Sequence, residues 1–474
     1  MILSMFYNIY NNYSRISNIW NIINKFHDIE YNDENLEKLM DLINCLEKDI
    51  IEGGCIYIKF MQWYISNLKA ENCSDNDFKK LNDLLINRFE YIFNNCDVHD
   101  LEHTKRIFVN DFGFELDDYV SGLKLIASGS IGQVYKGLRK TDDKIVVIKV
   151  KHPNIDSQIV EFQQFSNFIV AMQRYSFLRR RYKLNFNFND FMNDLQLQSD
   201  FDVEVSNNNQ FRRLYKDNVN IYFPKVYVNS KNVIVSEFMD IIDMDNISDY
   251  NRYKIVLNLS CFLYDTILVK NFIHNDLHSK NWGVIQDKIT KKYKLLVLDC
   301  ALCISSDNIK YNIELMNAIE SLTSDNSDKI TDVVNGIKNF IEIEKHNEII
   351  IKNKILDNIV NNGVKTVYIL DIVNYLIEDQ NLIMDTFLVN MLLTMILSEE
   401  FLKKENIFNC NSGNSTYISH TKNIYMDMYT FSNNKNSYYD LSKYIKKNLN
   451  DSAFKSSNVL FGKPCSKIKF APIE

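Results

Sequence analysis

One polar stretch decides the fold: Phe272-Ile273-His274-Asn275-Asp276-Leu277-His278-Ser279-Lys280-Asn281. It follows an apolar run that predicts a helix, and it places His274, Asp276 and Asn281 at the spacing His-x-Asp-x-x-x-x-Asn. The Asp276 carboxylate can accept or orient the proton of an attacking hydroxyl, and the Asn281 amide oxygen suits Mg²⁺. We expect His274 to brace the loop. Two alternatives stay open: a surface turn, or a metal site of His274, Asp276 and His278.

A carboxylate at the end of a buried strand is expected downstream. Leu295-Leu296-Val297-Leu298 predicts a short apolar strand that ends at Asp299. An aspartate after four apolar residues needs a cation or hydrogen-bond donors to remain charged. Mg²⁺ bridging two phosphates would supply that cation. The alternative is an aspartate that caps the next turn.

A small-residue turn lies upstream, in Ala127-Ser128-Gly129-Ser130-Ile131-Gly132-Gln133-Val134-Tyr135. It joins two expected strands, Lys124 to Ala127 and Val134 to Gly137. Small residues let backbone N–H groups approach phosphate oxygens closely. The turn is therefore a candidate phosphate-binding loop, with an ordinary tight hairpin as the alternative.

A lysine on the next expected strand completes the set. Lys149 lies in Lys144 to Val150, a β-branched run typical of a strand. A lysine inside an apolar strand costs free energy unless it is paired. Glu204, in Asp200-Phe201-Asp202-Val203-Glu204 on an expected helix, is the best partner. The alternative is an edge-strand lysine that faces solvent.

The order of these elements predicts an α+β fold of the two-lobed protein-kinase type, with a small β-rich N-lobe and a helical C-lobe. The turn matches GxGxxGxV except that Ala127 replaces the first glycine, Lys149 matches the lysine of VAIK, and Asp299-Cys300-Ala301 replaces DFG. We predict ATP and Mg²⁺ as cofactors, with Asn281 and Asp299 holding the metal. Glu237 and Met239 are further candidates for nucleotide contact.

The chain is expected to divide into three parts. Residues 1–118 form a helical N-terminal extension, and residues 119–405 form the kinase-like domain, with an N-lobe at 119–240 and a C-lobe at 241–405. Residues 406–474 are rich in Asn, Ser and Lys, and we expect a partly ordered tail there.

Composition bounds the partners and the compartment. A net charge of −7 gives no attraction to nucleic acid, so no nucleic-acid partner is predicted. Nine cysteines without a secretory signal predict free thiols in a reducing intracellular compartment, and Cys300 and Cys303 are interpreted as small core residues. No apolar run reaches the ~18 residues that a membrane span needs. The first 27 residues lack acidic side chains and are interpreted as a packed helix, with an organelle-targeting or membrane-surface helix as the alternative.

Further motifs resemble the UbiB family of atypical kinase-like proteins, also called AarF-type or ADCK, over residues from about 35 to 320. The family's Ala-rich loop is similar to the turn at 127–135, and its IKxGQ signature is similar to Ile58-Lys59-Phe60-Met61-Gln62. Its D-F-x-x-E-A-x-N helix corresponds to residues 200–207, ending at Asn207. Its H-x-D-x-H-x-x-N loop is present in full, including His278, which ordinary kinases lack.

The resemblance implies that Lys59 and Gln62 lie over the nucleotide pocket and occlude the groove for a protein substrate. It also implies ATP and Mg²⁺ binding, ATPase or small-molecule phosphotransfer activity, and a link to isoprenoid-quinone lipid metabolism at a membrane. Three positions depart from the family pattern: Met61 replaces the glycine of KxGQ, Ala301 the glycine of DFG, and Gly129 the usual alanine. None of them removes a charged or metal-binding group.

Three functions compete on these grounds. The first is a Mg²⁺-dependent ATPase or phosphotransferase that acts on a small molecule or lipid, with a peripheral membrane contact. The alternative is an ATP-binding pseudokinase scaffold. A conventional protein kinase is disfavoured, because no A-P-E motif follows Asp299 and no proline lies between Pro224 and Pro464.

Overall fold

The computed structural model describes residues 2–70, 76–94, 98–173, 188–266, 272–277 and 280–305, together with Lys270 and Asn353. It separates into two compact units. Unit 1 comprises Met1–Val205 and Lys225–Phe238, and unit 2 comprises Ser206–Pro224 and Met239–Glu474. The predicted boundaries at residues 118 and 240 stay predictions, and the predicted tail at 406–474 lies outside the described residues.

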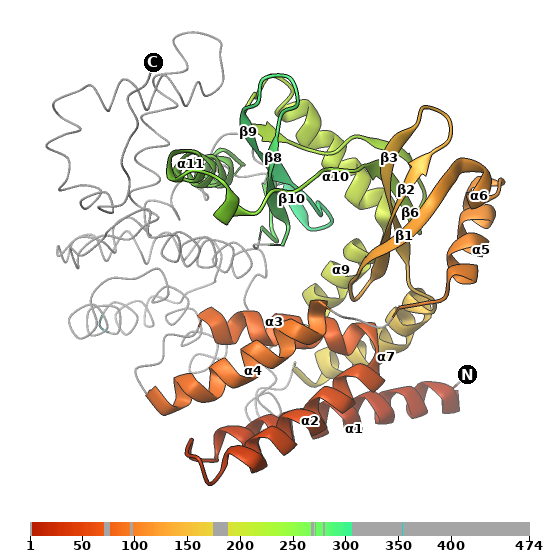
Figure 1. Cartoon of the computed structure of the whole chain (residues 1–474). Coiled ribbons are helices and arrows are strands. Elements are labelled where there is room, and N and C mark those ends of the chain that lie inside the picture. The colour runs from red at the N-terminus through yellow and green to blue at the C-terminus, as the bar shows by residue number, and fades with distance from the viewer. Residues whose placement is uncertain are drawn as a thin grey trace, which may run out of the picture. The chain divides into compact units, whose positions relative to one another are not determined.

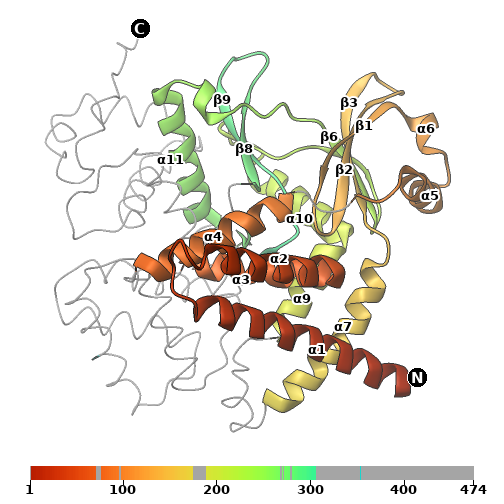
Figure 2. The ribbon, with the colours of Figure 1, turned by 60° about the horizontal axis from the view of Figure 1, so that its bottom comes forward.

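A group of helices forms much of unit 1 (Figures 1 and 2). They are α1 (Ile2–His27), α2 (Leu36–Gly53), α3 (Cys55–Ala70), α4 (Asn76–Asn94), α7 (Ile155–Gln173) and α9 (Phe188–Ser199). Buried apolar residues at three- and four-residue steps form one face of α1, α2 and α4. On α1 these are Ile16, Ile19, Ile23 and Phe26, which are buried against α2 and α7. Residues 2–27 are therefore a packed helix in this structure.

The rest of unit 1 is an antiparallel five-stranded sheet in the order β1-β2-β3-β6-β5, with two short helices beside it (Figure 1). The strands are β1 (Val120–Ser128), β2 (Gly132–Arg139), β3 (Lys144–Lys151), β5 (Val226–Asn229) and β6 (Val233–Glu237), and the helices are α5 (Leu101–Phe112) and α6 (Leu116–Tyr119). Because side chains alternate along a strand, Val146, Ile148 and Val150 face one core with Phe108 of α5. Lys149 therefore faces the opposite side of the sheet.

Unit 2 is built around two small sheets and a helix. Its elements are the later residues of α10 (Phe201–Leu214), β4 (Ile221–Tyr222), η1 (Met244–Asn246), α11 (Asp249–Asp265), β7 (Phe272–His274), β8 (Trp282–Gln286), β9 (Tyr293–Val297) and β10 (Cys303–Ser305). One sheet has the order β4-β9-β8, and the other pairs β10 with β7. Their core contains Phe211, Phe223, Phe262 and Val297.

Three local expectations differ from the structure. Residues 272–274, where a loop was expected, form strand β7, whereas the helix expected before them is present as α11, with Thr266 and Lys270 also helical. The stretch from Asn220 to Val228, whose β-branched and aromatic residues favour a single strand, is split into β4 and β5, which lie in different sheets, because Pro224 between them has no N–H for a ladder hydrogen bond. Strand β8, which was not expected, pairs with β9.

The described part of the chain contains cysteines without disulfide bonds and helices too short or too polar to span a membrane. The cysteines in that part of the chain are free thiols: Cys45, Cys55, Cys261, Cys300 and Cys303. No helix among those residues combines the length and the apolar character required to cross a bilayer.

Candidate active site

The strand lysine and the helix glutamate form an ion pair within unit 1. Lys149 lies in the middle of β3 between Val134 of β2 and Ile234 of β6. Its Nζ lies 2.7 Å from Oε2 of Glu204 on α10, and the side chains are 21% and 13% exposed. Nζ also lies 5.0 Å from the ring centroid of Phe201. The pair that the sequence predicts is therefore present, and β3 and α10 hold its two groups.

The candidate phosphate-binding turn joins β1 and β2 in the same unit. The N–H of Gly129 donates to the carbonyl of Gly132 at 3.0 Å, which closes the turn. A Cβ on Gly132 would lie 2.5 Å from the Val150 carbonyl oxygen, so this glycine is required by the close approach of β3. A Cβ on Gly129 would meet nothing nearer than 3.6 Å. The alanine that the family has at this position would therefore fit.

Strand pairing in unit 2 places the two predicted metal ligands at one end of a hairpin. Trp282 of β8 pairs with Val297 of β9, so Asn281 precedes one strand where Asp299 follows the other. The Leu298 N–H donates to the Asn281 carbonyl at 2.8 Å and closes this end. Asp299 is exposed and has a left-handed backbone, with φ of 48°.

Asp276 and Asn281 contact each other directly. The Asn281 Nδ2 donates to the Asp276 carbonyl at 2.8 Å and to its Oδ2 at 3.2 Å. Since the amide nitrogen has these partners, the side-chain oxygen is the atom of Asn281 that could bind a cation. Carboxylate and amide oxygens are the ligands that Mg²⁺ prefers, so Asn281 and Asp299 fit the predicted ion by donor type.

His274 braces this loop through both ring nitrogens. It is 1% exposed, and Nε2 donates to the Leu298 carbonyl at 3.1 Å while Nδ1 accepts from the Asp276 N–H at 3.4 Å. Burial is the largest influence and lowers the His274 pKa, but the Cys300 thiol, the Leu298 carbonyl and Asp276 together outweigh it, so the pKa is raised. No cluster of three or more His, Cys, Asp or Glu among the described residues could hold a metal. In the alternative metal site of His274, Asp276 and His278, His274 is not available as a ligand because both of its ring nitrogens contact protein groups. His278 lies outside the described residues.

Asn207 is a contact residue with no role evident from its own position in the sequence. It lies on α10 and its Nδ2 donates to the Cys300 carbonyl at 2.9 Å and to the Ala301 carbonyl at 3.5 Å. These carbonyls belong to the segment that replaces DFG. The family's D-F-x-x-E-A-x-N pattern was the available signal, since Asn207 is its last residue.

The remaining predicted residues lie on α3 and at the end of β6. Lys59 and Gln62 lie on α3 and are partly buried, while Met61 is fully buried in the helical core. The bulk of Met61 is therefore accommodated inside unit 1. Glu237 ends β6, and its backbone N–H donates to the Lys225 carbonyl at 2.9 Å. Met239 is partly buried and begins the second segment of unit 2.

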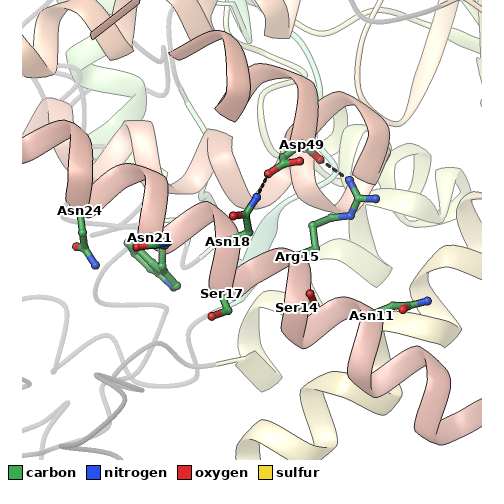
Figure 3. Close-up of a pocket in the computed structure, with 9 residues that line it drawn as sticks. Asn11, Ser14, Arg15, Ser17, Asn18, Asn21, Asn24 and Asp49 are labelled. Atoms are coloured by element: carbon green, nitrogen blue, oxygen red, sulfur yellow. Dashed lines mark hydrogen bonds between the residues drawn. The ribbon is translucent and has the colours of Figure 1, made fainter. Parts of the chain in front are cut away.

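A polar hollow of about 890 Å³ lies along α1 in unit 1 (Figure 3). Its described lining is Asn11, Ser14, Arg15, Ser17, Asn18, Trp20, Asn21, Asn24 and Asp49. Arg15 donates to the Asp49 carbonyl at 2.7 Å and lies over the Tyr57 ring. Its cation is thus already committed to protein groups, and none of the predicted nucleotide residues is in this lining.

The structure combines helices with a small antiparallel sheet, and a lysine on one strand of that sheet is paired with a glutamate on a helix. This combination defines a protein-kinase-like fold. Residues 91–334, about half of the chain, match the ABC1 atypical kinase-like domain. The chain belongs to the ABC1 atypical kinase-like family, which contains the UbiB and AarF-type proteins. The family prediction and the kinase-like fold are thereby confirmed, whereas the roles of the individual site residues stay predictions.

Several named proteins are similar to this chain. The "Probable serine/threonine-protein kinase abkC" of Dictyostelium discoideum is 30% identical over 48% of this chain and 33% of its own length. A "Probable protein kinase UbiB" of Blochmanniella pennsylvanica is 26% identical over 37% and 34%. The "ABC1 family protein YPL109C, mitochondrial" of Saccharomyces cerevisiae is 23% identical over 58% and 45%. The chain thus spans between a third and a half of the length of these relatives.

Proposed function

We propose that this chain is an ATP- and Mg²⁺-dependent enzyme, an ATPase or a phosphotransferase acting on a small molecule or lipid. The observation that carries the proposal is the ion pair between Lys149 and Glu204 at 2.7 Å. In kinases this pair holds the lysine for the α- and β-phosphates. A two-lobed arrangement, with a helical extension that brings Lys59 and Gln62 over the nucleotide, is part of the proposal.

Each predicted residue has a distinct task in this scheme. Lys149 neutralises the α- and β-phosphates, and the backbone N–H groups of residues 127–135 surround the phosphate oxygens. Asn281 and Asp299 hold Mg²⁺, which supplies positive charge to the β- and γ-phosphates when bound. Asp276 orients the attacking hydroxyl or water and accepts its proton. Asn281 holds the Asp276 carboxylate through the bond at 3.2 Å.

The names of the relatives support a proposal about the cellular compartment and the metabolic pathway of this chain. Several carry the UbiB name and one is described as mitochondrial. We extend this to a link with isoprenoid-quinone lipid metabolism, organelle targeting and a peripheral membrane contact. The competing proposal is an ATP-binding pseudokinase scaffold, and the observation in its favour is the Asp299-Cys300-Ala301 segment in place of DFG.

A thermal-shift experiment with ATP, with and without Mg²⁺, tests nucleotide binding. A ligand at about 100 times its Kd stabilises the folded state by about 2.7 kcal/mol, so the melting temperature should rise. Lys149→Ala should abolish this rise because the phosphate cation is lost. Lys144→Ala is the matched control, since Lys144 lies on the same strand with a side chain that is 63% exposed. Equal responses of the two variants would refute the role of Lys149.

Turnover separates the enzyme from the scaffold. Asp276→Asn should keep the ATP-dependent thermal shift and lose release of labelled phosphate from ATP, because no carboxylate remains to take the proton. Asp245→Asn removes a carboxylate with an 88% exposed side chain in the same unit and should change neither measurement. An Asp276→Asn protein that hydrolyses ATP at the full rate would eliminate the catalytic assignment, and a wild-type chain that binds ATP without turnover would favour the scaffold.

A further inference from the structure

Three histidines lie together beside the candidate phosphate-binding turn. His99 precedes α5, His103 lies on α5, and His152 directly follows β3. The rings of His99 and His103 have centroids 4.6 Å apart, and those of His99 and His152 have centroids 4.9 Å apart. Local sequence patterns give no signal for this cluster, because His99 and His152 are separated by 53 positions.

His152 holds the turn from two sides. Its backbone N–H donates to the Ile131 carbonyl at 2.9 Å, and its ring Nε2 lies 2.9 Å from the Gly129 carbonyl oxygen. The same nitrogen is 3.5 Å from the Ser128 hydroxyl. A carbonyl oxygen can only accept, so Nε2 of His152 must carry a hydrogen.

This assignment fixes the hydrogens on the next ring. With its hydrogen on Nε2, a neutral His152 has an acceptor at Nδ1, which lies 2.8 Å from Nδ1 of His99. His99 must therefore donate from Nδ1, and its Nε2 becomes an acceptor. Thr104 Oγ1 lies 2.8 Å from that Nε2 and supplies the hydrogen.

The chain of donors continues into the buried strand β2. Thr104 is fully buried, and its Oγ1 lies 3.0 Å from the Tyr135 hydroxyl, which must donate to it. The Gln133 amide donates to the Tyr135 hydroxyl and, at 3.0 Å, to the His99 carbonyl. Its side-chain oxygen accepts from the His99 N–H at 2.9 Å. Every hydrogen in this path thus points in one direction, from Gln133 to Gly129.

We propose that His99 and His152 form a neutral hydrogen-bond relay that positions the Gly129 carbonyl, and through it the turn that binds the nucleotide phosphates. The inference rests on the proposed function, because it assigns the two histidines as positioning residues for that site. Neither touches the nucleotide in the proposal. They act by holding one peptide of the turn in a fixed orientation.

A proton added to either ring breaks the relay. On His152 it would either place two N–H groups face to face across the 2.8 Å gap to His99 or force His99 into its other tautomer, which reverses the donors as far as Thr104. On His99 it would turn the Thr104 hydroxyl hydrogen toward Tyr135, whose own hydrogen would then lose its acceptor. Burial first, and then the neighbouring His152 and His103, lower the pKa of His99 to about 4, which favours the neutral form at pH 7.

The groups around the relay agree with neutral rings. His103 accepts from the Arg106 guanidinium at Nδ1 and donates to the Lys151 carbonyl from Nε2, which is the hydrogen-bond pattern of one N–H per ring. The titratable and charged groups that face the relay include Asp100 at the start of α5, His103 and Arg106 on α5, and Tyr135 on β2, while Lys151 contributes its backbone carbonyl.

Tautomer measurement on the full chain tests the relay without nucleotide. Nitrogen-15 NMR of histidine-labelled protein at pH 7 should give the Nδ1–H form for His99 and the Nε2–H form for His152. His99→Asn and His152→Gln assign the two signals among the eight histidines of the chain. The same tautomer on both rings, or a charged ring at pH 7, would overturn the relay.

ATP affinity in the presence of Mg²⁺ tests the positioning role. Gln places its amide nitrogen near the position of Nε2, whereas Asn places it near that of Nδ1. His152→Gln should therefore keep the donor to Gly129 and leave the Kd for ATP within about twofold. His152→Asn should raise the Kd about five- to tenfold, the equivalent of one lost hydrogen bond. His27→Gln, which changes a histidine paired with Asn82 on distant helices of the same unit, should have no effect.

The outcomes separate the two proposals. Equal ATP affinity of the His152→Asn and wild-type chains would overturn the positioning role while leaving the proposed function intact. Equal weakening by His152→Gln and His152→Asn would also overturn it, because the donor to Gly129 would not matter. Failure of the wild-type chain to bind ATP would overturn the proposed function and the nucleotide role of the turn, whereas the tautomers would still decide whether the relay exists.

Discussion

Two glycines of one turn should respond in opposite ways to the same substitution. In Gly132→Ala the new Cβ would lie 2.5 Å from the Val150 carbonyl oxygen and 3.1 Å from its carbon. These are backbone atoms of β3 and cannot rotate away, so β2 and β3 must separate near the Gly132–Lys151 pair. Such overpacking costs about 1–3 kcal/mol.

Gly129→Ala should cause neither a backbone clash nor backbone strain. The nearest atom to its Cβ would be the Gly132 carbonyl oxygen at 3.6 Å, which is an ordinary contact, and Gly129 is not among the glycines with positive φ. An alanine at a compatible backbone position stabilises by about 0.4–1 kcal/mol, because the unfolded chain loses freedom. The two variants should therefore differ by about 1.5–4 kcal/mol.

Scanning calorimetry measures this difference as a separation of melting temperatures. For a unit of this size 1 kcal/mol corresponds to about 2–4 °C, so Gly132→Ala should melt several degrees below the wild-type chain and Gly129→Ala at or slightly above it. Amide hydrogen exchange should show faster exchange in β2 for Gly132→Ala alone. If the two variants melt together, the close approach of β2 and β3 at Gly132 is wrong.

Three further perturbations follow from the contacts. In a double-mutant cycle, Lys149→Met and Glu204→Gln should show a coupling of about 1–3 kcal/mol, between the values for surface and buried pairs, and additive effects would contradict the ion pair. The pKa of His99 is lowered to about 4 by burial, so its contribution to stability is present above its ordinary pKa near 6.5 and is lost as pH falls toward 4. His99→Asn should make the urea midpoint less dependent on pH across that window, and an unchanged slope would exclude His99 as its source. Asn207→Ala should lower the free energy of unfolding by about 1–2 kcal/mol, because buried carbonyls lose a donor, and faster amide exchange of residues 300–302 should accompany it.

The features that could be predicted from the sequence are those that depend on residues close together along the chain. The β-branched residues around Lys149 predict a strand, and its need for a partner follows from the cost of burying a charge. Glu204 can be predicted as that partner because the helix motif that contains it is also a short continuous stretch of sequence. The strand ending at Asp299 is a run of apolar residues, and β9 matches it within a residue or two.

The missed features depend on contacts between distant residues. Strand β7 is only three residues long and is stabilised by pairing His274 with Cys303 of β10, so no periodicity marks it. His99, Thr104 and His152 form a network only after α5 and β3 have packed together. The same holds for Asn207, whose partners lie 93 and 94 positions away. A single sequence reports propensity and spacing, and these do not determine which distant groups will meet.

The segment that replaces DFG shows why a missing glycine is weak evidence against activity. Loss of a glycine matters where the backbone requires positive φ, and in this segment the positive φ lies at Asp299, not at Ala301. Aspartate tolerates that conformation better than most side chains. Ala301 is buried, and the carbonyls of Cys300 and Ala301 accept from Asn207. The Cβ of Ala301 therefore imposes no backbone strain here, and the segment is held by named hydrogen bonds. Ala301 in place of the DFG glycine therefore gives no physical reason to assign a pseudokinase. The choice between an enzyme and a pseudokinase depends on whether Asp276 and its neighbours support turnover of ATP.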